Sequence, residues 1–512
     1  RPRPPAAPRE PPVKTPSPYR PPREAAVKTC VPFLVAALAL PAAPAAFAAD
    51  PVAADPRVVQ ALDLARTWLE AQRAYEQVPG LSAAVVHDQE LLWTDAFGFA
   101  DPAGGRKARP DTIYSICSIS KLFTAIAVMQ QRDAGKLRLD DPVSRHLPWF
   151  TMKPGGRDGT EITVEGLLTH AAGLPREADV PYWSPPLFAF PTREKVIERL
   201  AGQQALYPPE TYFQYSNLGL TLAGEVAAAA AGVPYDTYVR KNVLEPLKLS
   251  STTPEMPEGE RGGRLAAGFS ARGRDGRRTP VPFFTAKGIA PAAGFASTAQ
   301  DLARFASWQF RLLSAGGAEV LRASTLREMQ RVHWVDPDFK TMWGLGFAVE
   351  DRDGTAFVGH GGSCPGYRTA LLLQPRTKLA TIVMANASGV DVGDWGRRLY
   401  DIVAPATTAA EKEPGKAKPA DPELRRYAGA YDARPWGGEI AVLPWDDGLA
   451  LLALPTDDPV KGLVKLKKTG EHTFRRIRKD ETLGEEVVFE LDADGNVERL
   501  KRHGNFSVRL KP

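Results

Sequence analysis

Residues 114–125 read Tyr-Ser-Ile-Cys-Ser-Ile-Ser-Lys-Leu-Phe-Thr-Ala, and this stretch decides how the chain is interpreted. Ser118 and Lys121 stand three residues apart, and the apolar residues that follow have the spacing of a buried helix. Side chains three apart on a helix share a face, with Cβ atoms roughly 5–6 Å apart, so an ammonium group can touch the hydroxyl that it activates. At a helix N-terminus, free N–H groups and the dipole also favour an oxyanion. Ser-x-x-Lys alone occurs by chance as a surface Ser and Lys, so the rest of the chain has to support this interpretation.

The composition is that of an ordinary globular protein. The 512 residues are 43% hydrophobic and 24% charged, which predicts two or three domains. The formal charge is +5, and residues 1–48, with seven basic and two acidic residues, account for all of it. The remainder is therefore neutral, and we expect no nucleic-acid partner.

Residues 1–49 have the pattern of an N-terminal extension and signal peptide. Basic residues precede an apolar run from Val31 to Leu40, and Ala46-Phe47-Ala48 follows as a cleavage sequence. The apolar run is too short to span a bilayer, so no stable membrane span is expected after cleavage. The sequence predicts an exported protein, periplasmic or extracellular; the alternatives are an uncleaved anchor and a disordered tail.

Export would leave two cysteines, Cys117 and Cys364, in an oxidising compartment, where one pairing is open to them. The seven histidines form no cluster with metal-ligand spacing. We therefore expect no metal site and no cofactor.

Helical and strand patterns alternate over residues 50–403, which we interpret as one catalytic domain. The expected elements are a helix over 55–77, a hairpin over 82–98, an Ala-rich helix over 218–231, strands over 356–360, 367–374 and 379–385, and a closing helix over 391–403. The turn over 361–366 can instead continue the first of these strands with a bend.

The composition changes after residue 403. Residues 404–420 are rich in Ala, Pro, Lys and Glu and are interpreted as a linker. Residues 421–512 hold seven short strand patterns at turn spacing, with a hairpin signal at Asp494-Gly495. This predicts a separate all-β domain, a small antiparallel barrel or sandwich.

Two further motifs follow the Ser-x-x-Lys pair. Tyr215-x-Asn217 stands just before the Ala-rich helix, and His-Gly-Gly occupies residues 360–362. In this order and spacing, over about residues 56–403, the chain resembles the β-lactamase-related serine hydrolases, a group that includes class C β-lactamases, D-alanyl-D-alanine peptidases, D-aminopeptidases and penicillin-recognising esterases. The flanking segments at 78–82, 167–175, 294–303 and 359–367 resemble this group too. The resemblance implies an α+β fold, an antiparallel sheet flanked by helices plus an all-α lobe, with the active site between them.

The resemblance also implies roles for single residues. Ser118 would be the nucleophile that forms an acyl-enzyme, and Lys121 would take its proton. Tyr215 would be a second general base or the acid to the leaving group, with a pKa lowered by the Lys121 cation. Asn217 would bind Lys121 and the substrate amide. The backbone N–H groups of Ser118 and Ser363 would form the oxyanion hole.

The third motif departs from the Lys-Thr-Gly that class C β-lactamases usually have. His360 with an ordinary pKa is mostly neutral at pH 7, so we expect weak dependence on a substrate carboxylate and activity that changes between about pH 6 and 7. Gly361 and Gly362 would let substrate lie against the strand edge. His-x-Gly resembles some peptidases, D-aminopeptidases and esterases.

The resemblance further implies a disulfide. Cys117 immediately precedes the nucleophile, Cys364 lies two residues past the third motif, and class A carbapenemases carry a disulfide at the equivalent positions. We therefore predict a Cys117–Cys364 bond; the alternative is two buried free thiols.

Three other motifs are interpreted as structural. Lys468-Thr469-Gly470 lies in the β domain and is expected to be a hairpin turn. The Gly-x-Ser-x-Gly elbow of α/β-hydrolases would need a glycine at position 365, where this sequence has Pro365, so an α/β-hydrolase is excluded. His170 is expected to fasten its loop rather than act as a base.

The leading hypothesis is thus an exported serine hydrolase whose substrate is a β-lactam, a D-amino-acid peptide or amide, or a small ester. The alternative is a catalytically silent penicillin-binding-like scaffold or cell-wall-binding protein that recruits a partner through its β domain.

Overall fold

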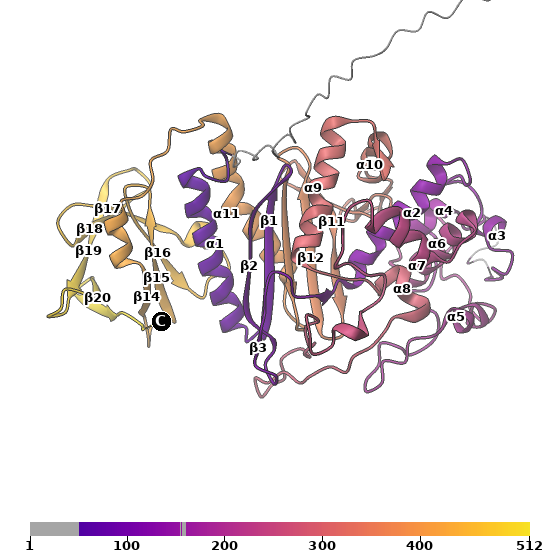
Figure 1. Cartoon of the computed structure of the whole chain (residues 1–512), viewed down its shortest axis with the longest axis horizontal. Helices are drawn as coiled ribbons and strands as arrows, with labels where there is room; N and C mark the ends of the chain where they lie inside the picture. Colours follow the sequence, from indigo (N-terminus) through magenta and orange to yellow (C-terminus); the bar gives the residue numbers. More distant parts are fainter. Residues whose placement is uncertain (1–50, 154, 156–159, 512) are drawn as a thin grey trace, which may run out of the picture. The chain divides into compact units, whose positions relative to one another are not determined.

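The computed structural model describes residues 51–153, 155 and 160–511. The expected signal peptide lies outside the described residues. The centre of the catalytic region is a nine-stranded antiparallel sheet with the order β3-β2-β1-β13-β12-β11-β10-β9-β8 (Figure 1). Its strands are β1 (Gly80–His87), β2 (Glu90–Asp101), β3 (Arg106–Lys107), β8 (Trp334–Val335), β9 (Met342–Trp343), β10 (Ala348–Arg352), β11 (Thr355–Cys364), β12 (Tyr367–Gln374) and β13 (Leu379–Ala385).

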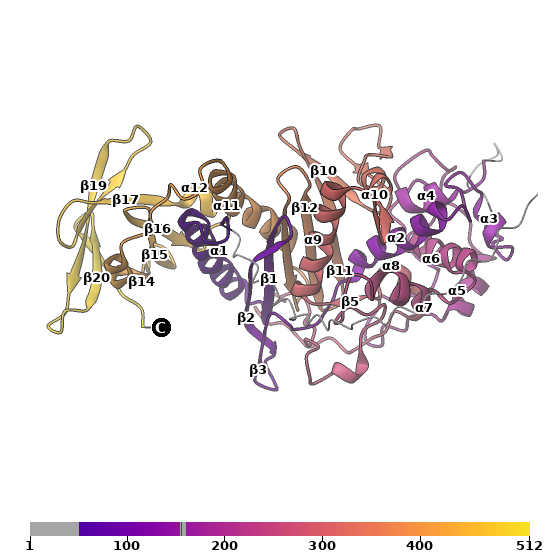
Figure 2. The same cartoon turned by 45° about the horizontal axis from the view of Figure 1, so that its top comes forward.

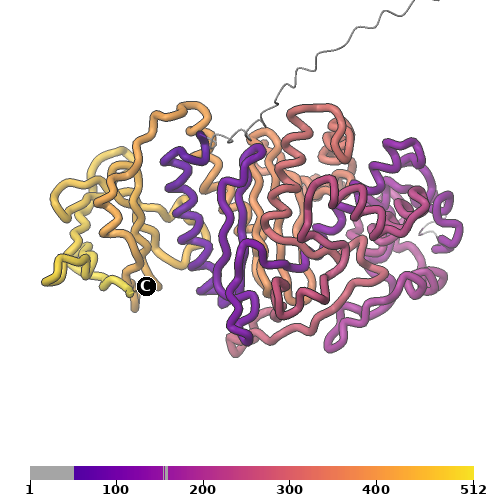
Figure 3. The backbone as a smooth tube through the Cα atoms, in the orientation of Figure 1, coloured from indigo at the N-terminus to yellow at the C-terminus, as the bar shows by residue number. Residues whose placement is uncertain are grey.

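One face of the sheet is covered by the helices α1 (Pro56–Tyr75) and α11 (Val392–Lys412), which lie side by side although they come from opposite ends of this region (Figure 3). Their shared core includes Trp68 and Leu399. The closing helix was expected to end at residue 403, but α11 continues to Lys412, into the segment interpreted as a linker. The Ala-rich composition there favours helix, and Pro405 is accommodated inside it.

The opposite face is covered by α9 (Ala299–Ala315), beyond which the helical lobe begins (Figure 2). The lobe is built around α2 (Ser120–Asp133), which packs against α6 (Asn217–Ala231). Its other elements are α3 (Val143–His146), α4 (Val164–Thr169), α5 (Arg193–Leu200), α7 (Tyr235–Val239) with a π-helical turn over Arg240–Leu244, α8 (Ala290–Ala293) and α10 (Ala323–Met329).

Helix α6 has clear start and stop signals. The Ser216 hydroxyl accepts a hydrogen bond from Gly219 N at 2.8 Å, and Gly232 ends the helix with a φ of 74°. Within the described residues, no single helix is long and apolar enough to cross a bilayer. Helix α6 and the Tyr235–Leu244 segment, which meet at an angle of 75°, are together long and apolar enough by length and composition alone. Most of α6 is buried inside the lobe.

The C-terminal region is an eight-stranded antiparallel sheet whose strands follow chain order. They are β14 (Gly429–Asp432), β15 (Glu439–Trp445), β16 (Gly448–Leu454), β17 (Val464–Lys468), β18 (Thr473–Ile477), β19 (Leu483–Leu491), β20 (Val497–Arg502) and β21 (Asn505–Val508). A bridge between Tyr431 and Arg509 brings the first strand to the last, so the sheet curls into a nearly closed barrel. The Lys-Thr-Gly sequence at 468–470 begins with the last residue of β17 and continues into the turn to β18, where Thr469 N donates to Thr473 O.

The barrel packs on α1 and α11. Trp68 Nε1 donates to Thr456 O at 2.8 Å, and Leu452 and Leu454 of β16 belong to the same apolar cluster as Trp68. Arg398 of α11 forms an ion pair of 3.1 Å with Asp458. The barrel therefore contacts helices that lie on the sheet face away from α2.

Candidate active site

Ser118 lies where the chain passes from the sheet into the helical lobe. The short strand β4 (Tyr114–Ser115) pairs with β5 (Ala296–Ser297), a 3-10 turn spans Cys117–Ile119, and α2 begins at Ser120. Ser120 holds this junction: its hydroxyl donates to Cys117 O at 2.5 Å and accepts from Phe295 N at 3.0 Å. Between residues 112 and 129, Ser118 is the one position that is not fully buried. A fixed backbone thus exposes a single hydroxyl.

Lys121 is fully buried and reaches back to that hydroxyl. Its Nζ lies 3.0 Å from Ser118 Oγ and donates at 2.8 Å to Asn217 Oδ1 and at 2.8 Å to Ala292 O. Burial holds the pKa of Lys121 well below its ordinary value, and the carboxylate of Glu177 opposes this. A buried amine beside a serine hydroxyl can therefore act as its base near neutral pH.

Tyr215 stands over the same two groups. Its ring centroid lies 4.9 Å from Lys121 Nζ, and the Ser118 side chain is among the groups that influence the pKa of its hydroxyl. We expected the Lys121 cation to lower the pKa of Tyr215, and this is wrong: burial raises it, because the phenolate would be desolvated. Tyr215 is thus a neutral phenol, suited to donate a proton and not to act as a standing base.

His360 is buried on β11, with its ring centroid 6.2 Å from that of Tyr215. Its Nδ1 lies 2.6 Å from Gly361 O. Burial, aided by Lys121, lowers the pKa of His360 to about 3. The expected change of activity between pH 6 and 7 therefore loses its basis in this residue, because the imidazole is neutral across that range.

The two glycines beside His360 differ in what they do. A Cβ on Gly361 would have only Thr369 O, at 3.8 Å, as a neighbour, which agrees with an open strand edge. A Cβ on the buried Gly362 would overlap Ile116 O and the Thr369 hydroxyl, so this glycine lets β11 pack against the turn that carries Ser118. The expectation that both glycines make room for substrate is therefore corrected for Gly362.

Strand β11 continues through the third motif to Cys364, as the alternative interpretation of residues 361–366 expected. Pairing with β10 stops at Gly359, so within the described residues the next five positions have no partner strand on that side. Ser363 is exposed on this segment, and its hydroxyl accepts from Arg368 of β12. A free edge beside Ser118 can receive an extended substrate.

A disulfide joins Cys117 to Cys364, with Cα atoms 5.7 Å apart. It ties the turn that carries the nucleophile to the end of β11. Cys117 has a φ of 49°, in the left-handed region that residues with a Cβ seldom adopt. Such backbone strain persists only where surrounding contacts impose it.

His170 fastens the loop after α4, as expected. Its Nδ1 accepts from Ser216 N at 3.1 Å, and its ring packs 4.3 Å from the ring of Tyr215. Burial holds the pKa of His170 well below its ordinary value. Trp343 of β9 packs against both rings and against His360, a contact that the sequence did not predict.

Two more charged residues were missed. Arg176 places its guanidinium 4.9 Å from the Tyr215 ring centroid, and the neighbouring Glu177 accepts from Asn217 Nδ2 at 2.8 Å. They directly follow the Leu174-Pro175 sequence that carries the resemblance, and this adjacency was the one available signal.

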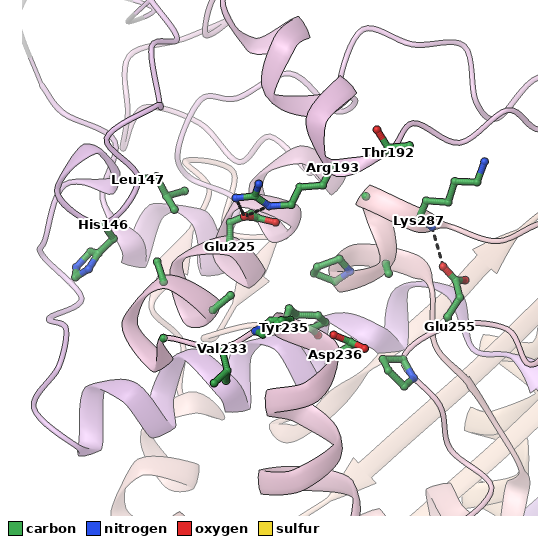
Figure 4. A pocket seen from close by; sticks show the side chains of 18 of the residues that line it. His146, Leu147, Thr192, Arg193, Glu225, Val233, Tyr235, Asp236, Glu255 and Lys287 are labelled. Atoms are coloured by element: carbon green, nitrogen blue, oxygen red, sulfur yellow. Dashed lines mark hydrogen bonds and ion pairs between the residues drawn. The ribbon is translucent and has the colours of Figure 1, made fainter.

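A cavity of about 810 Å³ lies elsewhere in the helical lobe (Figure 4). Arg193 pairs with Glu225 on its wall, and Tyr235 reaches from it to the Thr124 hydroxyl at 2.6 Å. Neither Ser118 nor Lys121 lines it. Within the described residues, no group of three or more His, Cys, Asp or Glu side chains could hold a metal ion.

The region that carries these residues is similar to known proteins. The family model described as beta-lactamase matches residues 65–404, more than half of the chain. This chain belongs to the beta-lactamase family. It is 29% identical over 389 residues to the human protein described as beta-lactamase-like 1, covering 73% of this chain and 75% of that protein.

Two further relatives of this beta-lactamase-family chain have penicillin-binding descriptions. Penicillin-binding protein 4 of Amycolatopsis lactamdurans is 28% identical over 334 residues, which is 62% of this chain and 83% of that protein. The octameric penicillin-binding protein homologue of Pyrococcus abyssi superposes with a TM-score of 0.60 and 24% identity, covering 88% of this chain and all of that one. The last comparison supports the fold, including the barrel region.

Proposed function

We propose that this protein is a serine hydrolase that forms an acyl-enzyme at Ser118 and hydrolyses an amide, β-lactam or ester bond. The observation that carries the proposal is the 3.0 Å contact between the Ser118 hydroxyl and the buried amine of Lys121. A nucleophile within hydrogen-bond reach of its base is the minimum that covalent catalysis requires.

In the acylation step, Lys121 removes the Ser118 proton as Oγ attacks the carbonyl carbon of the substrate. The tetrahedral oxyanion is held by the N–H groups of Ser118 and Ser363, a role that stays a prediction. Tyr215, a neutral phenol, gives its proton to the leaving group as the scissile bond breaks, and the proton on Lys121 returns to the phenolate. Water then attacks the acyl carbon by the same route in reverse and releases Ser118.

The substrate is proposed from the third motif. A neutral, buried His360 supplies no charge for a substrate carboxylate. This favours a peptidase or esterase over a β-lactamase, although all three reactions use the same acyl-enzyme. The partner is then a small molecule or peptide that lies along the free edge of β11.

The test is covalent labelling. Wild-type protein should be labelled by a fluorophosphonate or a fluorescent penicillin, and Ser118→Ala should not; Lys121→Met should be labelled at least 10³-fold more slowly. Rates of turnover of a chromogenic ester, a D-amino-acid anilide and a cephalosporin then show which of the three reactions is fastest. If neither probe labels wild type and no substrate turns over, the silent scaffold is the better explanation.

We also propose that the protein is exported, periplasmic or extracellular. The signal-like N-terminal sequence and a disulfide beside the nucleophile support this, because such bonds persist in oxidising compartments. Fractionation of cells that express the full chain, with thiol titration of the product, tests it. A cytoplasmic product with two free thiols would contradict the proposal.

A further inference from the structure

Glu177 is a fixed carboxylate at the edge of the catalytic site. Asn217 Nδ2 donates to its Oε1 at 2.8 Å, Arg176 Nε lies 3.3 Å from the same oxygen, and the hydroxyl of Tyr182 donates to Oε2. The Glu177 side chain keeps 22% of its surface exposed. Three donors on two oxygens leave it little freedom to turn.

The contact with Asn217 links this carboxylate to the base. A side-chain amide has an acceptor on one end and donors on the other, so its orientation decides what each end can bind. Asn217 presents Oδ1 to Lys121 Nζ at 2.8 Å and Nδ2 to Glu177. With the amide turned over, its donor end would face the Lys121 amine and its oxygen would face a carboxylate, and both contacts would be lost.

Glu177 also contributes charge to the site. The groups that face Lys121 are the neutral Tyr215, His170 and His360, the cation Arg176, and the anion Glu177. Arg176 and burial both disfavour the protonated amine, and Glu177 is the group that opposes them. Without it, the proton that Lys121 takes from Ser118 would be held less firmly.

We propose that Glu177 is a positioning residue of this site, which fixes the orientation of the Asn217 amide and supplies the counter-charge for Lys121. The catalytic role of Glu177 rests on the proposed function. Its effect on the charge of Lys121 is a property of the folded protein and does not depend on catalysis. Glu177 acts through Asn217 and Lys121 and is not expected to touch the reacting atoms.

The decisive variant is Glu177→Gln, which keeps the size of the side chain and removes its charge. We expect the titration of Lys121, followed by NMR of protein labelled with ¹⁵N-lysine, to move to lower pH by about one unit. The acid limb of kcat/KM should move the same way, because more acid is then needed to protonate the amine. At its plateau, kcat should fall about 10-fold as Asn217 loses its fixed orientation.

Two matched variants separate charge from structure. Glu177→Asp keeps the charge and should leave the Lys121 titration near its wild-type position. Tyr182→Phe removes a hydrogen bond to the same carboxylate and should not move it either. An unmoved Lys121 titration in Glu177→Gln overturns the proposal, and so does an equal shift in Tyr182→Phe, which would show a general loosening of the loop.

The NMR measurement needs no turnover, so the two proposals can fail separately. A shifted titration in protein that neither probe labels and that turns over no substrate would support the Glu177 assignment and contradict the hydrolase. Normal labelling with an unshifted titration would do the reverse. If Glu177→Gln does not fold, Glu177→Ala decides: it also removes the charge and should move the titration to lower pH, and no movement would overturn the proposal.

Discussion

Two histidines beside Tyr215 are buried in their neutral form, and this makes stability depend on pH. His170 is 1% exposed and His360 is 7% exposed, and burial lowers the pKa of both. In the unfolded chain each has a pKa near 6.5 and takes up a proton below it, whereas the folded state does not. The unfolded state therefore binds more protons, and the free energy of unfolding falls as the pH drops below about 6.5.

Between pH 7 and pH 5, His360 should cost about 2 kcal/mol of stability, and His170 should add a loss in the same direction. Chemical denaturation at the two pH values should show the combined loss in wild type, and His360→Asn and His170→Asn should each reduce it. His503→Asn, on the exposed surface of the barrel, is the control. Equal acid sensitivity in all four proteins would contradict the neutral, buried state.

The two glycines of the third motif should respond in opposite ways to an added methyl group. Gly362→Ala overpacks the contact between β11 and the Ser118 turn, so we expect a loss of about 1–3 kcal/mol in unfolding free energy and slower labelling of Ser118. Gly361→Ala has room and should unfold like wild type while KM rises. Thermal melts and labelling rates measure both, and a Gly362→Ala protein as stable as wild type would refute the overlap.

For single residues, the sequence identifies which side chains belong to the site better than it predicts their protonation states. Ser118, Lys121, Tyr215 and Asn217 could be found because the chemistry demands those types at fixed spacing. The pKa values of Tyr215 and His360 could not, because they depend on burial by segments far away in the chain. Glu177 could not be found either, since one acid among 60 Asp and Glu residues is distinguished only by its contact with Asn217.

The junction between β4 and α2 holds both a strained residue, Cys117, and the proposed nucleophile, Ser118. Cys117 holds a φ of 49° there, and its bond to Cys364 fixes the junction to β11. Replacing both cysteines with serine should lower the unfolding free energy by about 2–5 kcal/mol. Cys117→Gly combined with Cys364→Ser should recover about 1 kcal/mol of this, because glycine adopts positive φ without strain.

Urea titration of these two double variants beside oxidised and reduced wild type makes that comparison. Equal stability of the serine and glycine versions would show that Cys117 is not strained in solution.

The ends of helices were predicted well where the sequence carries clear capping residues and less well elsewhere. Helix α6 runs from Asn217 to Ala231, between the capping residues Ser216 and Gly232, whose residue types are typical of helix ends. Helix α11 continues past its predicted end at residue 403, because Pro405 is accommodated inside the helix and the apolar face continues to Ala410 in the core shared with α1.

At the scale of the whole molecule, the barrel and the catalytic region share a core. Trp68, Leu452 and Leu454 belong to one apolar cluster, so removing residues 421–512 would expose part of it. We expect the truncated protein to melt at lower temperature, with labelling of Ser118 in the folded fraction within about threefold of wild type. Trp68→Phe, which removes the hydrogen bond to Thr456 and part of the buried ring, should cost about 1 kcal/mol for the bond and more for the space that it leaves. A truncated protein with the wild-type melting temperature would contradict a shared core.

The pairing of β1 with β13 affects when the protein can fold during its synthesis. The first strand of the sheet finds its partner about 300 residues later, from Leu81↔Ala385 to His87↔Leu379, and α1 lies against α11 in the same way. A chain that emerges from its N-terminal end cannot complete its central sheet until β13 has emerged. The surroundings of Ser118 therefore stay incomplete through most of synthesis, and under the proposed function hydrolysis begins only when the sheet closes.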